Sequence, residues 1–301
     1  MPAILEITAL GRAYQGRQVL KDITASAAQG DVIALLGKNG AGKTTLLETI
    51  LGFAVPEQGE VRLFGTLSTE IGANEKQRIG FVPQQDELLE QLSPSEHLEL
   101  FRDFQPSWDQ PLCERLCQSW DIPMTKRIST LSVGQRQKLS IILALCHKPK
   151  LLILDEPVAS LDPIARRQFL TELVTIAADQ QSVILFSSHI VTDMERVANK
   201  VWLLKDQQLV WQDELDTLKE SVVKLHIDAA QPLPDQLPLP HQLRQQVQGN
   251  KATVTVKHWQ SAEQTRFEQQ LQAKIRVEYL NLEDLFLELH ENQEQSCDDE
   301  L

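Results

Sequence analysis

The chain opens with two segments that alternate between apolar and polar residues, followed by longer apolar runs. Ile4–Leu10 and Val19–Ala25 alternate as half-buried strands do, with Gly11–Gly16 as the expected turn between them. Later runs are apolar throughout, which is typical of parallel strands covered on both faces. These runs are 31–36, 150–154 and 182–187. Because helical segments separate them, the pattern predicts an α/β fold with a mostly parallel core sheet.

A helical insert is expected at about 86–147. Ser93-Pro94-Ser95-Glu96 predicts a helix start, since Ser93 suits the N-cap, Pro94 the first helical position, and Glu96 closes a capping box. A second helix is expected from Arg136 to His147, after Leu131–Gln135. The residues with helical spacing that we expect to face inward are Leu98, Phe101, Leu112, Leu116 and Trp120.

The pattern beyond residue 220 predicts a small α+β domain over 221–293, separate from a first domain over 1–220. The proline-rich stretches 231–234 and 237–240 are linker-like or loop-like. Strands are expected at 222–227, 252–258 and 275–279, and helices at 262–271 and 282–290. Residues 294–301 predict an acidic, disordered tail.

Net charge, apolar stretches and cysteine spacing exclude several classes of protein. A formal charge of −13 and a pI near 5.0 oppose broad attraction to nucleic acid, so no nucleic acid partner is expected. The first residues lack the basic and apolar regions of a secretory signal, and no apolar stretch reaches the ~20 residues of a spanning helix. Four cysteines without C-x-x-C spacing carry no zinc or redox signature. Cys113 and Cys117 are expected in the core, and free thiols suit a reducing cytoplasm.

The segment after the first apolar run has the composition of a phosphate-binding loop. It consists of Gly37, Lys38, Asn39, Gly40, Ala41, Gly42, Lys43, Thr44 and Thr45, and a helix-like segment follows. Glycines let backbone N–H groups converge on phosphate oxygens, and the helix N-terminus adds about half a positive charge. Lys43 suits the outer phosphates, and the Thr44 hydroxyl suits Mg²⁺.

Polar residues follow the ends of three other predicted strands. Asp155 and Glu156 end one apolar run, His189 follows another, and Gln84 follows Pro83 at the end of the strand 79–83. Ligands of doubly wound sheets bind at such carboxyl ends. Tyr14, in the expected first turn, suits either stacking on a base or an ordinary turn position.

These elements, in this order, resemble the ATP-binding cassette of ABC transporters over about residues 4–220. The resemblance adds Leu131–Gln135 and Ser160–Asp162 to the phosphate loop and strand-end residues. It implies a P-loop ABC ATPase fold with an antiparallel β subdomain and a helical subdomain beside the core sheet. More weakly, Leu282–Leu289 resembles the C-terminal end of cassettes from ABC-2-type exporters.

The resemblance also implies roles for individual residues. Lys43 and the loop amides would hold the β- and γ-phosphates of ATP, while Thr44 and Asp155 would order Mg²⁺. Glu156 would polarise the attacking water, and His189 would contact the γ-phosphate.

The same resemblance assigns Tyr14 to stacking on adenine and Gln84 to linking the metal with the helical subdomain. In a head-to-tail dimer, Ser132, Gly134 and Gln135 would contact the ATP of the second ATPase subunit. Val133 departs from the glycine most common in the family. Because a β-branched residue disfavours positive φ, we expect negative φ at Val133 and intact binding across the dimer.

The leading hypothesis is therefore an ATPase subunit that drives a separate transmembrane permease, with export as the expected direction. Such a subunit would lie on the cytoplasmic face of the cell membrane. A soluble ABC ATPase acting on ribosomes or DNA is the alternative, although this chain has one cassette and no sustained heptads. A nucleotide sensor without hydrolysis is disfavoured by Glu156 and His189. The transported substrate is not encoded in these motifs.

Overall fold

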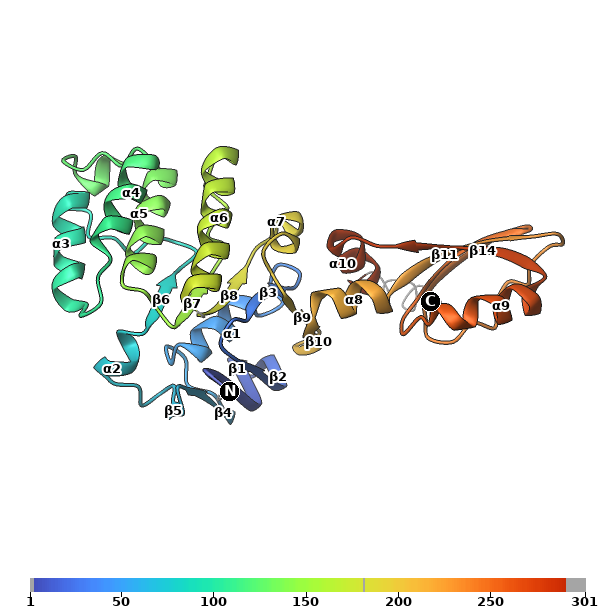
Figure 1. Ribbon diagram of the computed structural model, residues 1–301. Coiled ribbons are helices and arrows are strands. Elements are labelled where there is room, and N and C mark those ends of the chain that lie inside the picture. The colour runs from blue at the N-terminus through green and yellow to red at the C-terminus, as the bar shows by residue number, and fades with distance from the viewer. Residues whose placement is uncertain (1–2, 181, 291–301) are drawn as a thin grey trace. The chain divides into compact units, whose positions relative to one another are not determined.

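The computed structural model describes residues 3–180 and 182–290, so the expected acidic tail at 294–301 lies outside them. The chain divides into two compact units, residues 1–212 and 213–301 (Figure 1). The division between residues 212 and 213 lies before helix α8 (Leu215–Ser221), whereas the sequence analysis places the boundary between 220 and 221, at the end of that helix.

A six-stranded sheet with the order β10-β9-β3-β8-β7-β6 forms the centre of the first unit. Its strands are β3 (Val32–Leu36), β6 (Ile79–Val82), β7 (Leu151–Leu154), β8 (Val183–Ser187), β9 (Lys200–Lys205) and β10 (Gln208–Glu214). Strands β9, β3, β8, β7 and β6 pair in parallel, as the sequence predicts. Every residue of β3, β7 and β8 is buried, which explains their uninterrupted apolar runs.

Three helices follow strands of this sheet. They are α1 (Lys43–Ile50) after β3, α6 (Pro163–Gln180) after β7 and α7 (Val191–Glu195) after β8. In parallel neighbours, the carboxyl ends of the strands lie at one edge. The loops that leave β3, β7 and β8 therefore meet at that edge, where the sequence places its polar residues.

An antiparallel sheet, β2-β1-β4-β5, completes the strand part of the unit. It contains β1 (Leu5–Tyr14), β2 (Arg17–Ala27), β4 (Gln58–Leu63) and β5 (Thr66–Leu67), and the short helix α2 (Ala73–Lys76) follows. The turn is shorter than the expected Gly11–Gly16, because β1 continues to Tyr14, which pairs with Arg17 at the start of β2. Only Gln15 and Gly16 remain in the turn, with φ of 50° and 81°. Positive φ at both residues is what a two-residue hairpin requires.

The helical subdomain consists of α3 (Pro94–Phe104), α4 (Gln110–Ser119), the short helix η1 (Ile128–Thr130) and α5 (Val133–Cys146). Figure 1 shows α3, α4 and α5 grouped beside β6. The capping box of Ser93 and Glu96 is confirmed by hydrogen bonds in both directions.

Most of the expected inward positions of the subdomain are buried. Leu98, Leu116 and Trp120 are in the core, as are Cys113 and Cys117, whereas Leu112 is half-buried. The predicted inward position of Phe101 is wrong, since this side chain is 39% exposed. Its ring packs edge-on against the buried His97, with ring centroids 5.0 Å apart. Helical spacing identifies the inward stripe but not its margin.

The second unit is built on the antiparallel sheet β12-β13-β11-β14. Its elements after α8 are β11 (Val223–Ala229), β12 (Gln242–Gln248), β13 (Lys251–Val256), η2 (Ser261–Glu263), α9 (Gln264–Leu271), β14 (Ala273–Tyr279) and α10 (Leu282–His290). Strand β12 was not expected, because the edge strand reads Gln-Leu-Arg-Gln-Gln-Val-Gln and lacks an apolar run. The proline-rich stretch before it is a loop rather than a linker, since Leu237 and Leu239 join the core of this unit.

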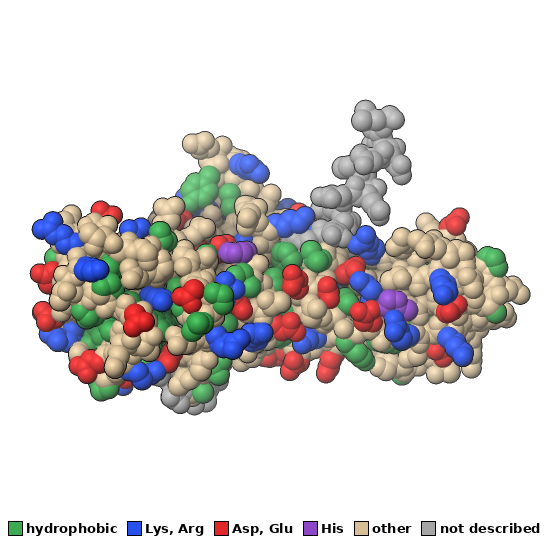
Figure 2. All heavy atoms as spheres, turned by 90° about the horizontal axis from the view of Figure 1, so that it is seen from above, with side chains coloured by type: hydrophobic (Ala, Val, Ile, Leu, Met, Phe, Trp, Pro, Cys, Tyr) green, Lys and Arg blue, Asp and Glu red, His purple; other side chains and the backbone are tan. Residues whose placement is uncertain are grey.

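Charges are mixed on the face shown in Figure 2, where Lys and Arg side chains lie among Asp and Glu side chains. None of the helices in residues 3–180 and 182–290 is both long and apolar enough to cross a bilayer.

Gly80 provides a test of packing between β6 and α5. A Cβ at Gly80 would lie 2.5 Å from the Ala144 carbonyl oxygen and 2.9 Å from Leu152 Cδ1. The backbone oxygen and the buried leucine cannot move away without disturbing the packing around them. We therefore expect Gly80→Ala to lower the free energy of unfolding of the first unit by about 1–3 kcal/mol. Urea unfolding followed by tryptophan fluorescence would measure this change.

The matched control is Gly72→Ala, at a position where the nearest atom to an added Cβ is the flexible Glu75 carboxylate, 3.5 Å away. Gly72 is the N-cap of α2, where replacement by alanine costs only a few tenths to about 1 kcal/mol. An equal loss for both variants would contradict tight packing at Gly80.

Candidate functional site

The loop between β3 and α1 has a backbone that only glycine adopts freely. Gly40 has φ of 79° and Gly42, the N-cap of α1, has φ of 103°. Gly37 is required for a different reason, because an added Cβ would lie 2.8 Å from the Leu204 carbonyl oxygen. The tip, Asn39 and Gly40, is exposed, whereas Ala41 and Thr45 are half-buried. This geometry leaves the first N–H groups of α1 unpaired within the helix and available to an anion.

Lys43 folds back over the loop that precedes it. Its Nζ donates hydrogen bonds to the carbonyl oxygens of Gly37, at 2.9 Å, and of Lys38, at 3.3 Å. Burial lowers the pKa of Lys43, while the nearby Glu156 and Asp155 carboxylates oppose that shift. An incoming phosphate would add the negative charge that favours the ammonium form.

Asp155, at the end of β7, is buried and connects the phosphate loop with β8. Thr44 Oγ1 donates a hydrogen bond of 2.7 Å to Asp155 Oδ2, and Ser187 Oγ donates one of 2.6 Å to Oδ1. Ser187 Oγ also accepts the backbone N–H of Glu156, at 2.9 Å. Ser187 was missed as a site residue by the sequence reading, although a hydroxyl at the last position of an apolar strand is a usable signal.

The Thr44–Asp155 pair has the chemistry of a magnesium ligand set. Hydroxyl and carboxylate oxygens are hard ligands, and Mg²⁺ usually keeps waters and phosphate oxygens in addition to one or two protein groups. Two oxygens 2.7 Å apart at the mouth of a phosphate loop fit such a site.

Glu156 and His189 form a second pair at the same edge of the sheet. The Nδ1 atom of His189 lies 3.2 Å from Oε2 of Glu156. Glu156 has φ of 50°, an uncommon conformation for a residue with a side chain, and strain of this kind concentrates at functional sites. The Glu156 side chain is 15% exposed and that of His189 52%, so the pair faces solvent on the histidine side.

Tyr14 is 43% exposed at the end of β1, and Arg12 holds one side of its ring. The Arg12 guanidinium carbon lies 4.7 Å from the ring centroid. Arg12 is itself fixed by a 2.8 Å hydrogen bond to the Val55 carbonyl oxygen and an ion pair with Glu57. The hairpin that carries Tyr14 contacts the phosphate loop, since a Cβ at Gly42 would lie 3.1 Å from Val19.

Gln84 is exposed in the loop after β6. Among the described residues, no hydrogen bond joins it to Thr44 or Asp155. The loop is tied instead to α5, through an ion pair of 3.0 Å between Asp86 and Arg136. The structure therefore places Gln84 beyond a strand end of the sheet but does not bring its amide to the oxygen pair.

The N-terminus of α5 is capped by its own side chains. Ser132 Oγ accepts the Gln135 backbone N–H at 3.2 Å, and Gln135 Oε1 accepts the Ser132 N–H at 3.0 Å. Val133 is the first helical residue, 54% exposed, and is not among the residues with positive φ, which confirms the expected backbone. A Cβ at Gly134 would lie 2.9 Å from the Ser160 carbonyl oxygen, so this glycine allows α5 to contact the segment after Glu156.

Comparison with known proteins agrees with this geometry. The profile of the family described as ABC transporter matches residues 20–159. The chain is 30% identical over 224 residues to the ABC transporter ATP-binding protein YtrB of Bacillus subtilis (strain 168), covering 74% of this chain and 76% of that protein. It is 29% identical over 303 residues to the Nod factor export ATP-binding protein I of Cupriavidus metallidurans, covering 96% and 98%.

The likeness extends to solved structures. The structure of an ATP-binding subunit of an ABC transporter superposes with a TM-score of 0.66 at 28% identity, covering 72% of this chain and 92% of that one. The phosphate loop, the strand-end carboxylates and the helical subdomain described above all lie within residues 1–212. This chain therefore belongs to the family of ATP-binding subunits of ABC transporters, which are ATPases.

Proposed function

We propose that this ATPase subunit drives a separate transmembrane permease, in the direction of export, by closing head to tail with a second ATPase subunit around ATP. The observation that carries the proposal is the meeting of Lys43, Thr44, Asp155, Glu156 and His189 at one edge of the core sheet. Such a set can bind a triphosphate and activate water beside it.

In the proposed reaction, the N–H groups of the loop and Lys43 hold the β- and γ-phosphates. Thr44 and Asp155 would hold Mg²⁺, which neutralises charge on the phosphates when bound. Glu156 accepts a proton from the attacking water as it approaches the γ-phosphate. His189, 3.2 Å from that carboxylate, keeps it oriented and contacts the γ-phosphate. Tyr14, backed by Arg12 on one side of its ring, offers its ring to adenine.

Closure in a dimer is supported by the N-terminus of α5. Ser132 and Val133 are exposed, and a helix of 14 residues directs the positive end of its dipole there. Ser132, Gly134 and Gln135 would meet the γ-phosphate held by the second subunit. Cleavage of that phosphate removes the charge that holds the interface together and lets the subunits separate.

Gln84 is proposed to sense the metal site and relay its state to the helical subdomain. Its support is indirect: the loop that carries Gln84 is already fastened to α5 through Asp86 and Arg136. The proposed location is the cytoplasmic face of the cell membrane, reached through the permease. Export is supported by the likeness to a Nod factor export protein along nearly the whole chain, including the second unit.

Replacing Glu156 by glutamine tests the assignment of the base. The amide keeps the shape of the side chain but cannot accept the proton, so we expect ATP hydrolysis to slow by at least about a hundredfold. Binding of ATP should persist, and gel filtration with ATP and Mg²⁺ should show a stable dimer. Glu99→Gln, on the exposed side of α3, is the control and should leave the rate unchanged.

Lys43→Ala should lose binding of labelled ATP, since its ammonium is the buried cation of the loop. If Glu156→Gln remained monomeric with ATP and hydrolysed it at the normal rate, the proposed mechanism would be wrong.

Val133→Gly tests whether the departure at the N-terminus of α5 impairs the dimer. The backbone there is already helical with negative φ, so glycine supplies no conformation that valine lacks. We expect an ATPase rate within about twofold of the parent chain, because the exposed valine blocks no backbone donor. A sharp rise in the rate would mean that valine obstructs contact with the second subunit.

Co-purification from detergent-solubilised membranes tests the partner. A chain carrying an affinity tag, expressed at native levels, should retain a multispanning protein, and ATPase activity should rise in its presence. Recovery of ribosomes or nucleic acid in place of a membrane protein would favour the other class of ABC ATPase and contradict the permease assignment.

A further inference from the structure

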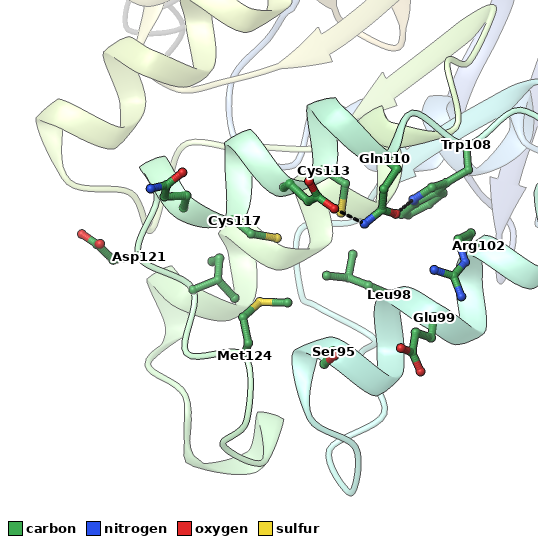
Figure 3. A pocket seen from close by; sticks show the side chains of 13 residues that line it. Ser95, Leu98, Glu99, Arg102, Trp108, Gln110, Cys113, Cys117, Asp121 and Met124 are labelled. Carbon is green, nitrogen blue, oxygen red and sulfur yellow. Dashed lines mark hydrogen bonds between the residues drawn. The ribbon is translucent and has the colours of Figure 1, made fainter.

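A pocket of about 500 Å³ lies in the helical subdomain, apart from the residues proposed to bind ATP. Its floor is apolar and includes Leu98 of α3 and Met124 of the segment after α4, together with two cysteines of α4. Figure 3 shows Cys113 and Cys117 projecting from α4 into the space that faces Leu98 and Met124. The rim carries charged and amide side chains that reach solvent: Glu99, Arg102, Glu114, Gln118 and Asp121.

Three thiols meet beside this pocket. Cys113, Cys117 and Cys146 are all free and buried. Hydrogen bonds from the thiols of Cys117 and Cys146 lower the pKa of Cys113, against the opposing effect of burial. Contact with Cys113 and burial raise the pKa of Cys117 and of Cys146. Cys113 lines the pocket and is also connected through the backbone of Asp109 to Cys146. An entering molecule can therefore reach Cys113, and its lowered pKa favours the thiolate, which is the reactive form.

The position of Cys113 in α4 acts in the same direction. The helix begins after its N-cap Asp109, and Cys113 donates its backbone N–H to the Asp109 carbonyl oxygen at 3.0 Å. A thiolate near a helix N-terminus is stabilised by the positive end of the dipole, although the Asp109 carboxylate at the N-cap raises the pKa of Cys113. Arg102, on the rim of the pocket, adds a smaller favourable charge.

Geometry decides which thiol can join Cys113 in a disulfide. Cys117 lies four residues along the same helix, where Cβ atoms are about 5–6 Å apart, beyond the ~3.5–4.5 Å of a disulfide. Cys146 comes from α5, and its carbonyl oxygen accepts the Asp109 N–H at 2.7 Å. Two backbone hydrogen bonds thus connect Cys146 through Asp109 to Cys113, which holds the end of α5 against the start of α4 beside these two residues.

We propose that Cys113 is a site of reversible thiol oxidation that reacts with small organic disulfides entering the pocket and then forms a disulfide with Cys146. In the first step, the Cys113 thiolate attacks one sulfur of the small disulfide RSSR, whose S–S bond breaks to release RS⁻ and leave Cys113 as a mixed disulfide. The Cys146 thiol gives its proton to RS⁻ and attacks the Cys113 sulfur. The second RS⁻ leaves and takes up the proton that Cys113 had lost, so two RSH are formed for one protein disulfide.

The disulfide would connect two helices of the subdomain. It would fix the C-terminal end of α5, the helix whose N-terminus lies at Ser132. Oxidation would therefore act on the helix proposed to contact ATP, although the thiol chemistry itself does not depend on that proposal.

Peptide mapping after exposure to glutathione disulfide tests the site. The full-length chain carrying Cys297→Ser leaves only the three clustered thiols, since the sequence has four cysteines. After treatment of the folded protein, trapping of remaining thiols with iodoacetamide and digestion, mass spectrometry should find the Cys113 peptide linked to the Cys146 peptide. Dithiothreitol should reverse the link.

Variants separate the roles of the thiols. Cys146→Ser should stop at the mixed disulfide with glutathione on Cys113, Cys113→Ser should lose modification, and Cys117→Ser should still form the link. Circular dichroism of each variant verifies folding, and the mapping of the parent chain stands even if a variant fails to fold. A link between Cys113 and Cys117, unmodified parent protein, or unchanged modification of folded Cys113→Ser would each overturn the proposal.

Discussion

The buried carboxylate of Asp155 is the constraint on which the rest of the site depends. A charge that is only 3% exposed is tolerable when hydrogen bonds satisfy it, and here Thr44 and Ser187 supply one to each oxygen. These bonds join the start of α1, the end of β7 and the end of β8 at one point. Since the parallel pairing of β7 and β8 already aligns the strand ends, the hydrogen bonds refine an arrangement that the sheet produces.

The second carboxylate depends on the same point. Ser187 accepts the Glu156 N–H while donating to Asp155, so one hydroxyl positions two neighbouring acidic residues for which we propose different roles. The chain turns at Glu156 through a left-handed conformation, which sets its carboxylate beside His189. Asp155 is thereby buried, with a hydrogen bond to each carboxylate oxygen, whereas the Glu156 side chain is partly exposed to solvent. This difference suits one for holding a cation and the other for accepting a proton.

The sequence was informative where a single local pattern determines the outcome. The apolar runs, the phosphate loop and the capping box of Ser93 each depend on neighbouring residues, and all are found where expected. Strand β12 escaped notice because an edge strand of glutamines is held by pairing with β13, which local composition does not report. Ser187 escaped for a similar reason: its importance comes from two partners about thirty residues away in the chain. The position of Tyr14 at the end of β1 could not be predicted locally, because it depends on the register in which β1 pairs with β2.

The close approach of Gly134 to Ser160 has a mechanical consequence. With no room for a methyl group between the start of α5 and that carbonyl oxygen, the two segments cannot slide past one another without separating. The two segments are therefore expected to move together. Glu156 lies four residues before Ser160 in one segment, and the N-cap Ser132 lies two residues before Gly134 in the other. In the proposed mechanism, a movement that begins at Glu156 when the γ-phosphate is cleaved would therefore displace α5 and the helical subdomain.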